Sequence, residues 1–282
     1  MHIKFIPSYK LYGGIFMHIF IFRKRFLLFF FCILCLILLI LFSFSIHDSP
    51  ILAVSLNSNS AISENLQNTF NNLSNNTDKI AYLTFDDGPR KKCTPEVLDI
   101  LKEENVKATF FVVGKYVKEN PDLIKREYDE GHFIANHGYD HNNEKFYQSN
   151  ESFKNEILST DKEIGNVLGI ENYCSHVFRF PNGYMAKAYK SNKKQALSLL
   201  NYLNYAYVDW NCLNKDSEVK TSSYQLLNNL KKTSKNKGTL VILMHDSGDV
   251  NDTASILKDS IYFLRSQGYE FHNFYDFITD LK

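Results

Sequence analysis

The sequence predicts an α/β fold with parallel strands, preceded by a segment that crosses a membrane. Short β-type runs alternate with helical patterns from residue 80 to residue 282, at a spacing that indicates crossover helices between parallel strands. The first 50 residues differ in kind, because they contain ten of the 23 phenylalanines. Periodicity by itself fits both a barrel-like (β/α) fold and an open doubly wound sheet.

The N-terminal segment is the first expected element. Residues 26–42 are 17 consecutive apolar residues, and residues 43–46 extend them to the ~20 that a membrane-spanning helix needs. Because Arg-Lys-Arg at 23–25 precedes the run, we expect residues 1–25 to be a cytoplasmic leader and the rest of this single-pass cell-membrane protein to be extracytoplasmic. The alternative is a signal peptide that is cleaved to secrete the protein. Signal peptides have apolar parts of only about 7–15 residues, which favours the anchor.

Residues 47–79 are expected to be a linker. From residue 55 to residue 79 the chain contains eight Asn and five Ser, with Leu, Ile and Phe that show no sustained period. Such a tract buries too little apolar surface to offset the chain entropy lost on folding. We therefore expect a disordered tether between the membrane and a folded domain at 80–282.

The domain 80–282 is long enough to bury a sizeable core, and its 26 basic and 28 acidic side chains speak against a nucleic-acid-binding protein. Thr94-Pro95 and Asn120-Pro121 are typical of helix starts, and Gly131 and Gly268 are typical of helix ends. The expected strands are 80–85, 108–113, 132–135, 177–180, 206–209, 240–244 and 269–271. The expected helices are 94–105, 121–130, 151–168, 193–203, 222–235 and 253–267.

Two adjacent carboxylates end the first strand, in the segment TFDDGP at residues 84–89. Successive side chains of a strand point to opposite faces, so Asp86 and Asp87 approach a site from different directions and suit different tasks. Gly88-Pro89 turns the chain at this point. The alternative interpretation of DDGP alone is an Asp-Gly turn with one capping carboxylate.

Two histidines follow the third strand, in the segment HGYDH. His137 and His141 are four residues apart, which on a helical turn places both imidazoles on one face, about 5–6 Å apart at Cβ. The pair suits a divalent metal, zinc above all, with cobalt or another transition metal as the alternative. Catalytic zinc commonly has three protein ligands, and Asp87 is the candidate for the third. Without a third ligand, two surface histidines would be the simpler interpretation.

Two further charged groups follow apolar strands. Arg179, in FRFPNGY, needs an acidic partner if it is buried. His245 ends the apolar run LVILMH and reaches the same edge of the sheet, although alone it could be a core histidine. Asp209 and Asp216 both lie in the segment before it, and either could orient His245 and raise its pKa.

Taken in order, TFDDGP, HGYDH, RFPNG, a segment with Asp-Trp, and LMHD resemble the five motifs of polysaccharide deacetylases with a NodB homology domain, carbohydrate esterase family 4. Residues 80–282 look most like membrane-anchored peptidoglycan N-acetylglucosamine deacetylases. The resemblance implies a distorted (β/α) barrel of seven or eight units. It also implies a general base at Asp86, metal ligands at Asp87, His137 and His141, an arginine at Arg179 that holds the base, and a general acid at His245.

The chain departs from the family pattern in three places. Gly138 stands where Ser or Thr usually follows the first histidine, so a loop-fixing hydroxyl is missing, and Asn182 replaces the more usual residue of the arginine motif. Aligning Trp210 with the family's tryptophan makes Asp216 the aspartate that tunes the acid, whereas Asp209-Trp210 read literally makes it Asp209; we favour Asp216. Tyr139 is a further candidate wall against a sugar ring. The substrate-binding residues implied are Pro181, Asn182, Gly183, Tyr184, Trp210 and Leu243.

The function expected from this resemblance is metal-dependent hydrolysis of N-acetyl groups on an N-acetylated polysaccharide, with peptidoglycan N-acetylglucosamine as the first candidate substrate. Muramic-acid and chito-oligosaccharide deacetylases are alternatives, as is a surface glycan-binding module whose site is catalytically dead. A glycosidase with two catalytic carboxylates would leave the paired histidines unexplained.

Overall fold

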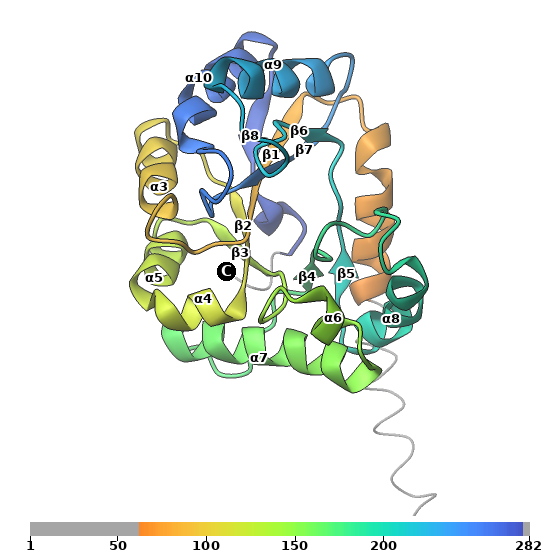
Figure 1. Ribbon diagram of the computed structural model, residues 1–282. Coiled ribbons are helices and arrows are strands. Elements are labelled where there is room, and N and C mark those ends of the chain that lie inside the picture. Colours follow the sequence, from red (N-terminus) through yellow and green to blue (C-terminus); the bar gives the residue numbers. More distant parts are fainter. Residues whose placement is uncertain (1–61, 279–282) are drawn as a thin grey trace, which may run out of the picture. The chain divides into compact units, whose positions relative to one another are not determined.

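The sheet is built around β1 (Ile80–Asp86), which lies in the interior of eight parallel strands. The computed structural model describes residues 62–278, and their strands follow the order β5-β4-β3-β2-β1-β7-β6, with β8 paired to β1 (Figure 1). The other strands are β2 (Thr109–Val112), β3 (Phe133–Asn136), β4 (Val177–Phe178), β5 (Ala206–Tyr207), β6 (Cys212–Leu213), β7 (Leu240–His245) and β8 (Glu270–His272).

One edge of β1 is shared between two strands, which makes the sheet curl. Along one side, β1 pairs with β7. Along the other side, residues 80–82 pair with β8 and residues 84–86 pair with β2. Within the described residues β5 and β6 do not pair with each other, so the curl stays open between them (Figure 1). The predicted parallel α/β fold is confirmed, and it takes the form of an open half-barrel.

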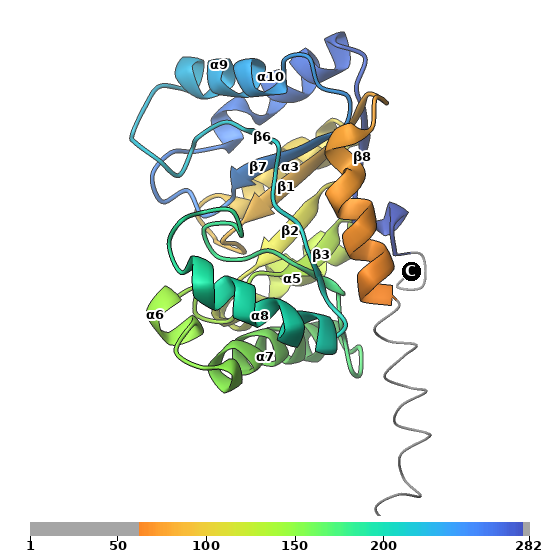
Figure 2. The same cartoon turned by 90° about the vertical axis from the view of Figure 1, so that its right-hand side faces the viewer.

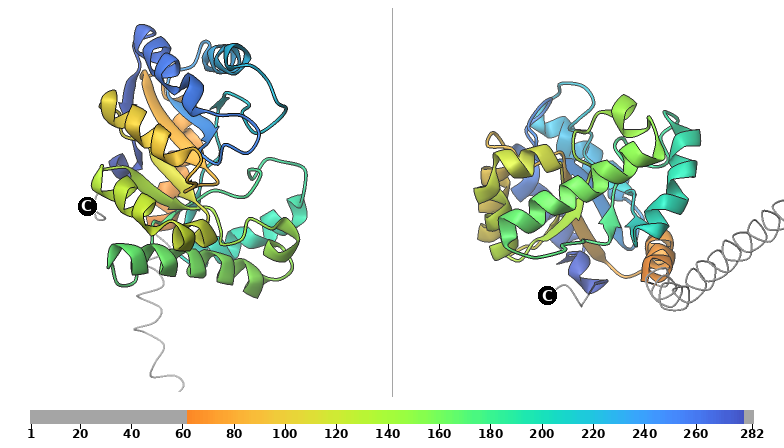
Figure 3. Two further views of the ribbon diagram at one scale, coloured as in Figure 1. Left: turned by 60° about the vertical axis from the view of Figure 1, so that its left-hand side comes forward. Right: turned by 90° about the horizontal axis from the view of Figure 1, so that it is seen from below.

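Helices cover the outer face of the curl. Going around it, α9, α10, α3, α5, α7 and α8 each contact the next (Figures 1 and 3). Two shorter helices, α4 (Gly114–Glu119) and α6 (Asn143–Phe146), were not expected from the sequence. The longer ones are α3 (Thr94–Glu103), α5 (Pro121–Asp129), α7 (Asn150–Leu168), α8 (Lys190–Tyr202), α9 (Ser223–Ser234) and α10 (Ala254–Ser266).

The side chains of β1 alternate between two cores. Ala81, Leu83 and Phe85 are buried in the outer core, between the sheet and its helices. Tyr82 belongs to the inner core, inside the curl. By the same alternation Asp86 projects from the inner face. It therefore emerges inside the curl at the carboxyl end of the strand.

Part of the expected linker is a folded element. Residues 62–72 form a helix that a 3₁₀ turn at Leu73–Asn75 continues, so the prediction of a disordered tether is wrong for residues 62–75. Leu66, Phe70 and Leu73 are buried in the inner core. Their spacing is helical, but the stripe is only one residue wide and the surrounding asparagines conceal it.

This N-terminal helix lies beside the edge strand β5 (Figures 1 and 2). The side-chain amide of Gln67 accepts the N–H of Tyr207 at 2.9 Å and donates to the carbonyl oxygen of the same residue at 3.1 Å. It thereby makes the two hydrogen bonds that a neighbouring strand would make. The fold therefore extends to the N-terminal side of residue 80.

The predicted strands and helices are present, with ends that differ by a few residues. Strand β6 was missed because two residues show no period. Gly131 and Gly268 follow α5 and α10 with φ angles of 81° and 82°, as predicted for glycines that end helices. Thr94-Pro95 does begin a helix, but an N-cap at Thr94 is wrong, because Cys93 holds the N-cap position of α3 and the Thr94 hydroxyl donates to Asp246.

No helix between residues 62 and 278 is both long and apolar enough to cross a membrane. The leader at 1–25, the anchor at 26–46 and the first part of the linker at 47–61 lie outside the described residues.

Candidate active site

The predicted site residues gather at the carboxyl end of the curl. Asp86 and His245 are opposite each other in the register of β1 and β7. His137 and Arg179 directly follow β3 and β4, whose last residues are also paired. Because the strands are parallel, their carboxyl ends open onto one edge, and side chains far apart in sequence meet there.

Asp87, His137 and His141 form a cluster in which one ligand atom of each residue lies within 4.8 Å of the others. Asp87 Oδ1 is 3.5 Å from Nε2 of His137 and 3.2 Å from Nε2 of His141. The Nδ1–H of His137 donates to the main-chain oxygen of Arg179 at 2.8 Å. This bond leaves the Nε2 lone pair facing the cluster, which is how metal-binding histidines are commonly oriented.

The cluster fits a divalent cation. Asp87 Oδ1 is buried, and no hydrogen-bond partner for it is present in the described part of the chain. Burial alone would raise the pKa of Asp87, yet the neighbouring histidines outweigh burial and hold that pKa below its usual value. Burial, and then His137, lowers the pKa of His141. A carboxylate beside two imidazoles is the donor set that zinc and similar metals bind.

Asp86 is held by Arg179, which is completely buried. The guanidinium donates from Nη1 to Asp86 Oδ1 at 2.8 Å and to Thr84 Oγ1 at 2.7 Å, and from Nε to the carbonyl oxygen of Val208 at 3.0 Å. The second carboxylate oxygen, Oδ2, lies 3.8 Å from Nε2 of His137. Asp86 thus has one oxygen fixed by a buried charge pair and the other directed at the metal-binding cluster.

His245 is paired with Asp216. Its Nδ1–H donates to Asp216 Oδ1 at 2.7 Å, its backbone N–H donates to Oδ2 at 2.8 Å, and the Thr253 hydroxyl donates to Oδ2 at 2.7 Å. Burial alone would lower the pKa of His245, but the bond to Asp216, helped by Asp87 and Asp86, outweighs burial and raises the pKa to about 9. His245 is therefore an imidazolium at neutral pH.

Asp209 has a different partner. Its carboxylate accepts the backbone N–H groups of Tyr184 at 2.8 Å and Met185 at 3.0 Å. Asp209 therefore shapes the loop after β4, and the structure pairs His245 with Asp216, as the sequence favoured.

The expected substrate-binding residues line up around that loop. Pro181 and Gly183 are buried, Asn182 is exposed with φ of 63°, and Tyr184 is half-buried. The N–H of Gly183 donates to Phe180 O at 2.7 Å, and that of Tyr184 is taken by Asp209. Of these three consecutive N–H groups, that of Asn182 has no acceptor within the described residues.

Two further predicted residues, Trp210 and Leu243, lie outside the loop. A Cβ on Gly183 would lie 2.7 Å from the Trp210 ring, so the indole packs directly against the loop. Leu243 is 6% exposed and sits two residues before His245 on the inner face of β7. Trp210 also borders a pocket of about 490 Å³ whose lining includes Phe70 and Ser74 of the N-terminal element.

The chain resembles known proteins over this same region. A family model described as Polysaccharide deacetylase matches residues 74–207. The peptidoglycan-N-acetylmuramic acid deacetylase PdaA of Bacillus subtilis is 32% identical over 208 residues, which cover 74% of each chain. The chain belongs to the polysaccharide deacetylase family.

Other members of the deacetylase family show how far the likeness extends. The peptidoglycan-N-acetylglucosamine deacetylase PgdA of Listeria monocytogenes is 36% identical over 69% of this chain, which spans only 38% of that longer relative. The solved structure of a Streptococcus mutans CE4 esterase has a TM-score of 0.65 at 27% identity and covers 73% of this chain and 90% of its own. A CE4 family pseudoenzyme from Bacillus anthracis has a TM-score of 0.58 at 26% identity, over 71% and 65% of the two chains.

The structure also reveals supporting carboxylates to which the sequence assigned no role. Asp246 is fully buried beneath the first motif and accepts the Thr94 hydroxyl. A Cβ on Gly88 would lie 2.1 Å from Asp246 Oδ2, so only glycine fits beside it. Burial first, and then the charges of Asp87 and Asp86, raises the pKa of Asp246 to about 7. Its position directly after His245 was the one available signal.

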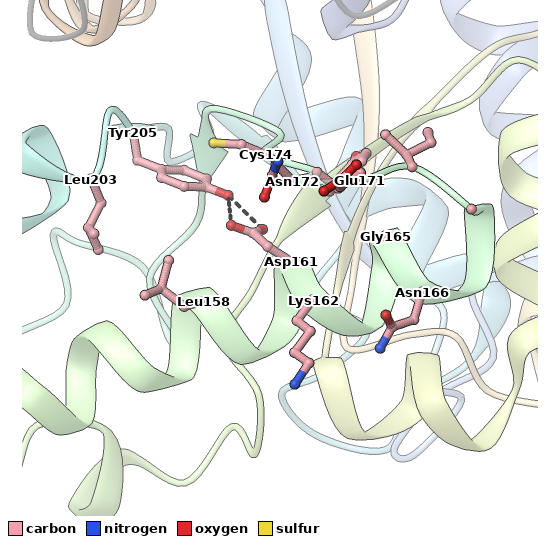
Figure 4. Close-up of a pocket in the computed structure, with 13 residues that line it drawn as sticks. Leu158, Asp161, Lys162, Gly165, Asn166, Glu171, Asn172, Cys174, Leu203 and Tyr205 are labelled. Atoms are coloured by element: carbon pink, nitrogen blue, oxygen red, sulfur yellow. Dashed lines mark hydrogen bonds between the residues drawn. The ribbon is translucent and has the colours of Figure 1, made fainter. Parts of the chain in front are cut away.

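Two further supporting carboxylates, Glu156 and Asp161, lie on α7. Asp161 accepts the Tyr205 hydroxyl at 2.6 Å (Figure 4). It also accepts the side-chain N–H of Asn136 at 2.8 Å. It borders a pocket of about 670 Å³ that contains none of the predicted site residues. Glu156, five residues earlier on the same helix, binds the loop between His137 and His141.

Proposed function

We propose that this chain is a metal-dependent N-deacetylase that hydrolyses the N-acetyl groups of amino sugars in peptidoglycan. One observation carries the proposal: an Arg-held carboxylate, Asp86, and an Asp-held imidazolium, His245, end two adjacent strands in register beside a three-ligand cluster. Hydrolysis of an amide needs a base for water, an acid for the departing amine and stabilisation of an oxyanion, and each has a candidate here.

Each protein group has a distinct task in this reaction. Asp87, His137 and His141 would hold a divalent cation, which would supply Lewis-acid chemistry for the amide carbonyl and for the attacking water. Asp86 takes the proton from the attacking water through Oδ2, while Arg179 keeps the other oxygen in place. The N–H of Asn182 donates to the developing oxyanion. His245 then gives the Nε2 proton to the sugar nitrogen, and Asp216 stabilises its charged form.

We assign zinc as the metal, because a His₂Asp set with room for water is typical of catalytic zinc sites. Cobalt is the expected functional substitute, since imidazole and carboxylate ligands accept several transition metals. Within this assignment Asp87 binds the metal, which is inconsistent with a glycosidase in which Asp86 and Asp87 act as paired acid and base.

Peptidoglycan N-acetylglucosamine is our first candidate substrate, as it was from the sequence alone. The named relatives act on peptidoglycan N-acetylmuramic acid and on peptidoglycan N-acetylglucosamine, so both sugars are candidates in the same polymer. Chito-oligosaccharides are the third candidate. The anchor proposed at residues 26–46 would place the domain at the outer surface of the cell membrane, close to the cell wall, and a cleaved signal would secrete it instead.

A glycan-binding module with a dead site is the alternative from another class, and the family contains a pseudoenzyme. Against it stands the retention of the complete set of reactive side chains in mutually consistent contacts. The set comprises Asp86, Asp87, His137, His141, Arg179, Asp216 and His245.

The test is acetate release from peptidoglycan, from chito-oligosaccharides and from acetylated xylan by the purified chain. We expect release from peptidoglycan, its loss with a chelator and its recovery with zinc or cobalt. Full activity after metal removal would exclude the mechanism, and full activity of Asp86→Asn would exclude Asp86 as the base. Separating glucosamine from muramic acid after digestion identifies the sugar.

A further inference from the structure

The loop at residues 137–141 carries both histidine ligands, and α4 holds one side of it. The carbonyl oxygens of residues 138 and 139 accept the N–H groups of Gly114 and Lys115, each at 3.0 Å. The Lys115 ammonium also donates to the carbonyl oxygen of Asp140 at 2.8 Å. The carbonyl oxygens of three consecutive loop residues, 138–140, are therefore bound by one short element.

The other side of the loop is held by Glu156 of α7. Its Oε2 accepts the N–H of Tyr139 at 2.7 Å and the N–H of Asp140 at 2.8 Å. Glu156 is 4% exposed, so bulk water has little access to replace these bonds. Bonds to an ionised acceptor are stronger than bonds between neutral groups, and removal of the carboxylate would leave two loop N–H groups without their acceptor.

The loop needs such support because its backbone is strained. Gly138 has a φ of 86° and His141 a φ of 56°, and the second value is disfavoured for any residue with a Cβ. A side chain at position 138 is excluded by space, since its Cβ would lie 2.8 Å from the Phe146 ring and 3.5 Å from Glu156 Oε2. The Glu156 carboxylate therefore lies beside position 138, where the family usually has a Ser or Thr whose hydroxyl fixes the loop.

We propose that Glu156 is a positioning residue for the metal centre: by holding the loop between His137 and His141, it sets the spacing of the two imidazoles before the ion binds. This inference rests on the proposed metal site. Glu156 acts through main-chain N–H groups, not through contact with the ion or the substrate. Its effect should therefore be seen first in metal affinity, as for residues that orient metal ligands from behind.

The experiment uses the full chain, stripped of metal and titrated with zinc by calorimetry, with cobalt as a spectroscopic probe of ligand geometry. The variants are Glu156→Gln, which keeps the size but loses the charge, and Glu156→Asp, which keeps the charge but shortens the reach. Glu163→Gln is the matched control, a half-buried carboxylate on the same helix. Thermal unfolding of each metal-free protein separates loss of structure from loss of binding.

We expect Glu156→Gln to bind zinc roughly 10–100-fold more weakly and to change the visible cobalt spectrum, with cooperative unfolding retained in the metal-free state. Glu156→Asp should lie between the wild type and Glu156→Gln, and Glu163→Gln should match the wild type. Should Glu156→Gln not fold, Glu156→Asp decides. A folded variant at position 156 with wild-type zinc affinity and an unchanged cobalt spectrum would overturn the proposal.

The same titration distinguishes this inference from the proposed function. A wild-type chain that binds one zinc ion but releases no acetate would refute the deacetylase activity, while the affinities of the variants would still decide the role of Glu156. A wild-type chain that binds neither zinc nor cobalt would overturn both.

Discussion

The site has two halves, an acid half formed by Asp216 and His245 and a metal half formed by Asp87, His137 and His141. Each half contains an aspartate with a buried oxygen, and the two halves satisfy that carboxylate in opposite ways. In the acid half, Asp216 has both oxygens engaged, by His245 and by Thr253. In the metal half, Asp87 keeps a buried oxygen for which the described residues offer no hydrogen bond. The protein itself therefore sets the charge of His245, whereas Asp87 and its histidines are arranged for a cation that the chain does not supply.

Asp87→Ala should have the largest effect, because it removes one ligand of three. We expect kcat/KM for acetate release to fall on the order of 10³-fold or more, since Lewis-acid stabilisation is worth several kcal/mol. Calorimetric zinc titration and acetate assays measure the loss. Asp259→Ala, an exposed carboxylate on α10, is the control. If Asp87→Ala kept tight zinc binding, the assignment of the metal half would be wrong.

Asp216→Asn should have the next largest effect and act on the other half alone. Because the acid must be protonated, the wild-type rate should decline as pH rises through about 9, the pKa of His245. Without the carboxylate that pKa falls, so the alkaline limb should move towards lower pH and the rate at pH 8 should drop roughly 10²-fold or more. Asp209→Asn is the matched control, and it should leave the alkaline limb in place.

The ion pair of Asp216 and His245 also makes the free energy of unfolding depend on pH. The pKa of His245 is raised in the folded state above its usual 6.5, so the pair stabilises the fold fully below pH about 6.5 and loses this effect as pH rises through about 9. Denaturant unfolding of the wild type and Asp216→Asn at pH 6 and pH 9.5 measures the gap. A gap that widened at pH 9.5 would contradict the pairing.

Phe70→Ala tests whether the inner core can be destabilised without changing the metal half or the acid half of the site. This residue is 7% exposed in the inner core, and its truncation should cost about 3–5 kcal/mol in the free energy of unfolding. Zinc affinity and the alkaline limb should stay unchanged in the folded fraction. Ile62→Ala on the same helix, at a side chain that is 48% exposed, should cost less than about 0.5 kcal/mol. Equal losses for both variants would mean that the helix does not pack as described.

Thr253→Val should have the smallest effect. It removes one of the hydrogen bonds to Asp216 and the acceptor of the Asn214 side-chain N–H, and it keeps the shape, so we expect a loss of about 1–3 kcal/mol in unfolding free energy and a slight downward shift of the alkaline limb. Ser255→Ala, at an exposed hydroxyl of α10, is the control. A shift as large as that of Asp216→Asn would show that Thr253, not Asp216, governs His245.

The strands and long helices could be predicted because their signals are local. Apolar runs such as LVILM, prolines at helix starts and glycines beyond helix ends act within a few residues of themselves. The helix at 62–72 was missed for a related reason. Its buried side chains are one per turn among asparagines, and only the inner core of the curl shows that they are covered.

The chemistry of the site was also readable, because carboxylates, histidines and an arginine at strand ends are rare enough to be informative. Which aspartate serves His245 was not decided by spacing, since Asp209 and Asp216 are both near in sequence. The structure decides it by placing Asp216 Oδ1 2.7 Å from Nδ1 of His245. Glu156 had no sequence signal at all, because its partners are two backbone N–H groups of a distant loop.

The sequence by itself thus determined the parallel α/β class and the residue types that can bind a metal and move protons. The tertiary structure alone decided three matters: the open edge of the curl, the pairing of each carboxylate, and the support of the histidine loop by α7. The physical reason is the range of the interactions. Helix and strand periods are properties of neighbouring residues, whereas a buried charge is satisfied by whatever the fold brings next to it, here across gaps of 29 residues for Asp216 and His245 and 93 for Asp86 and Arg179.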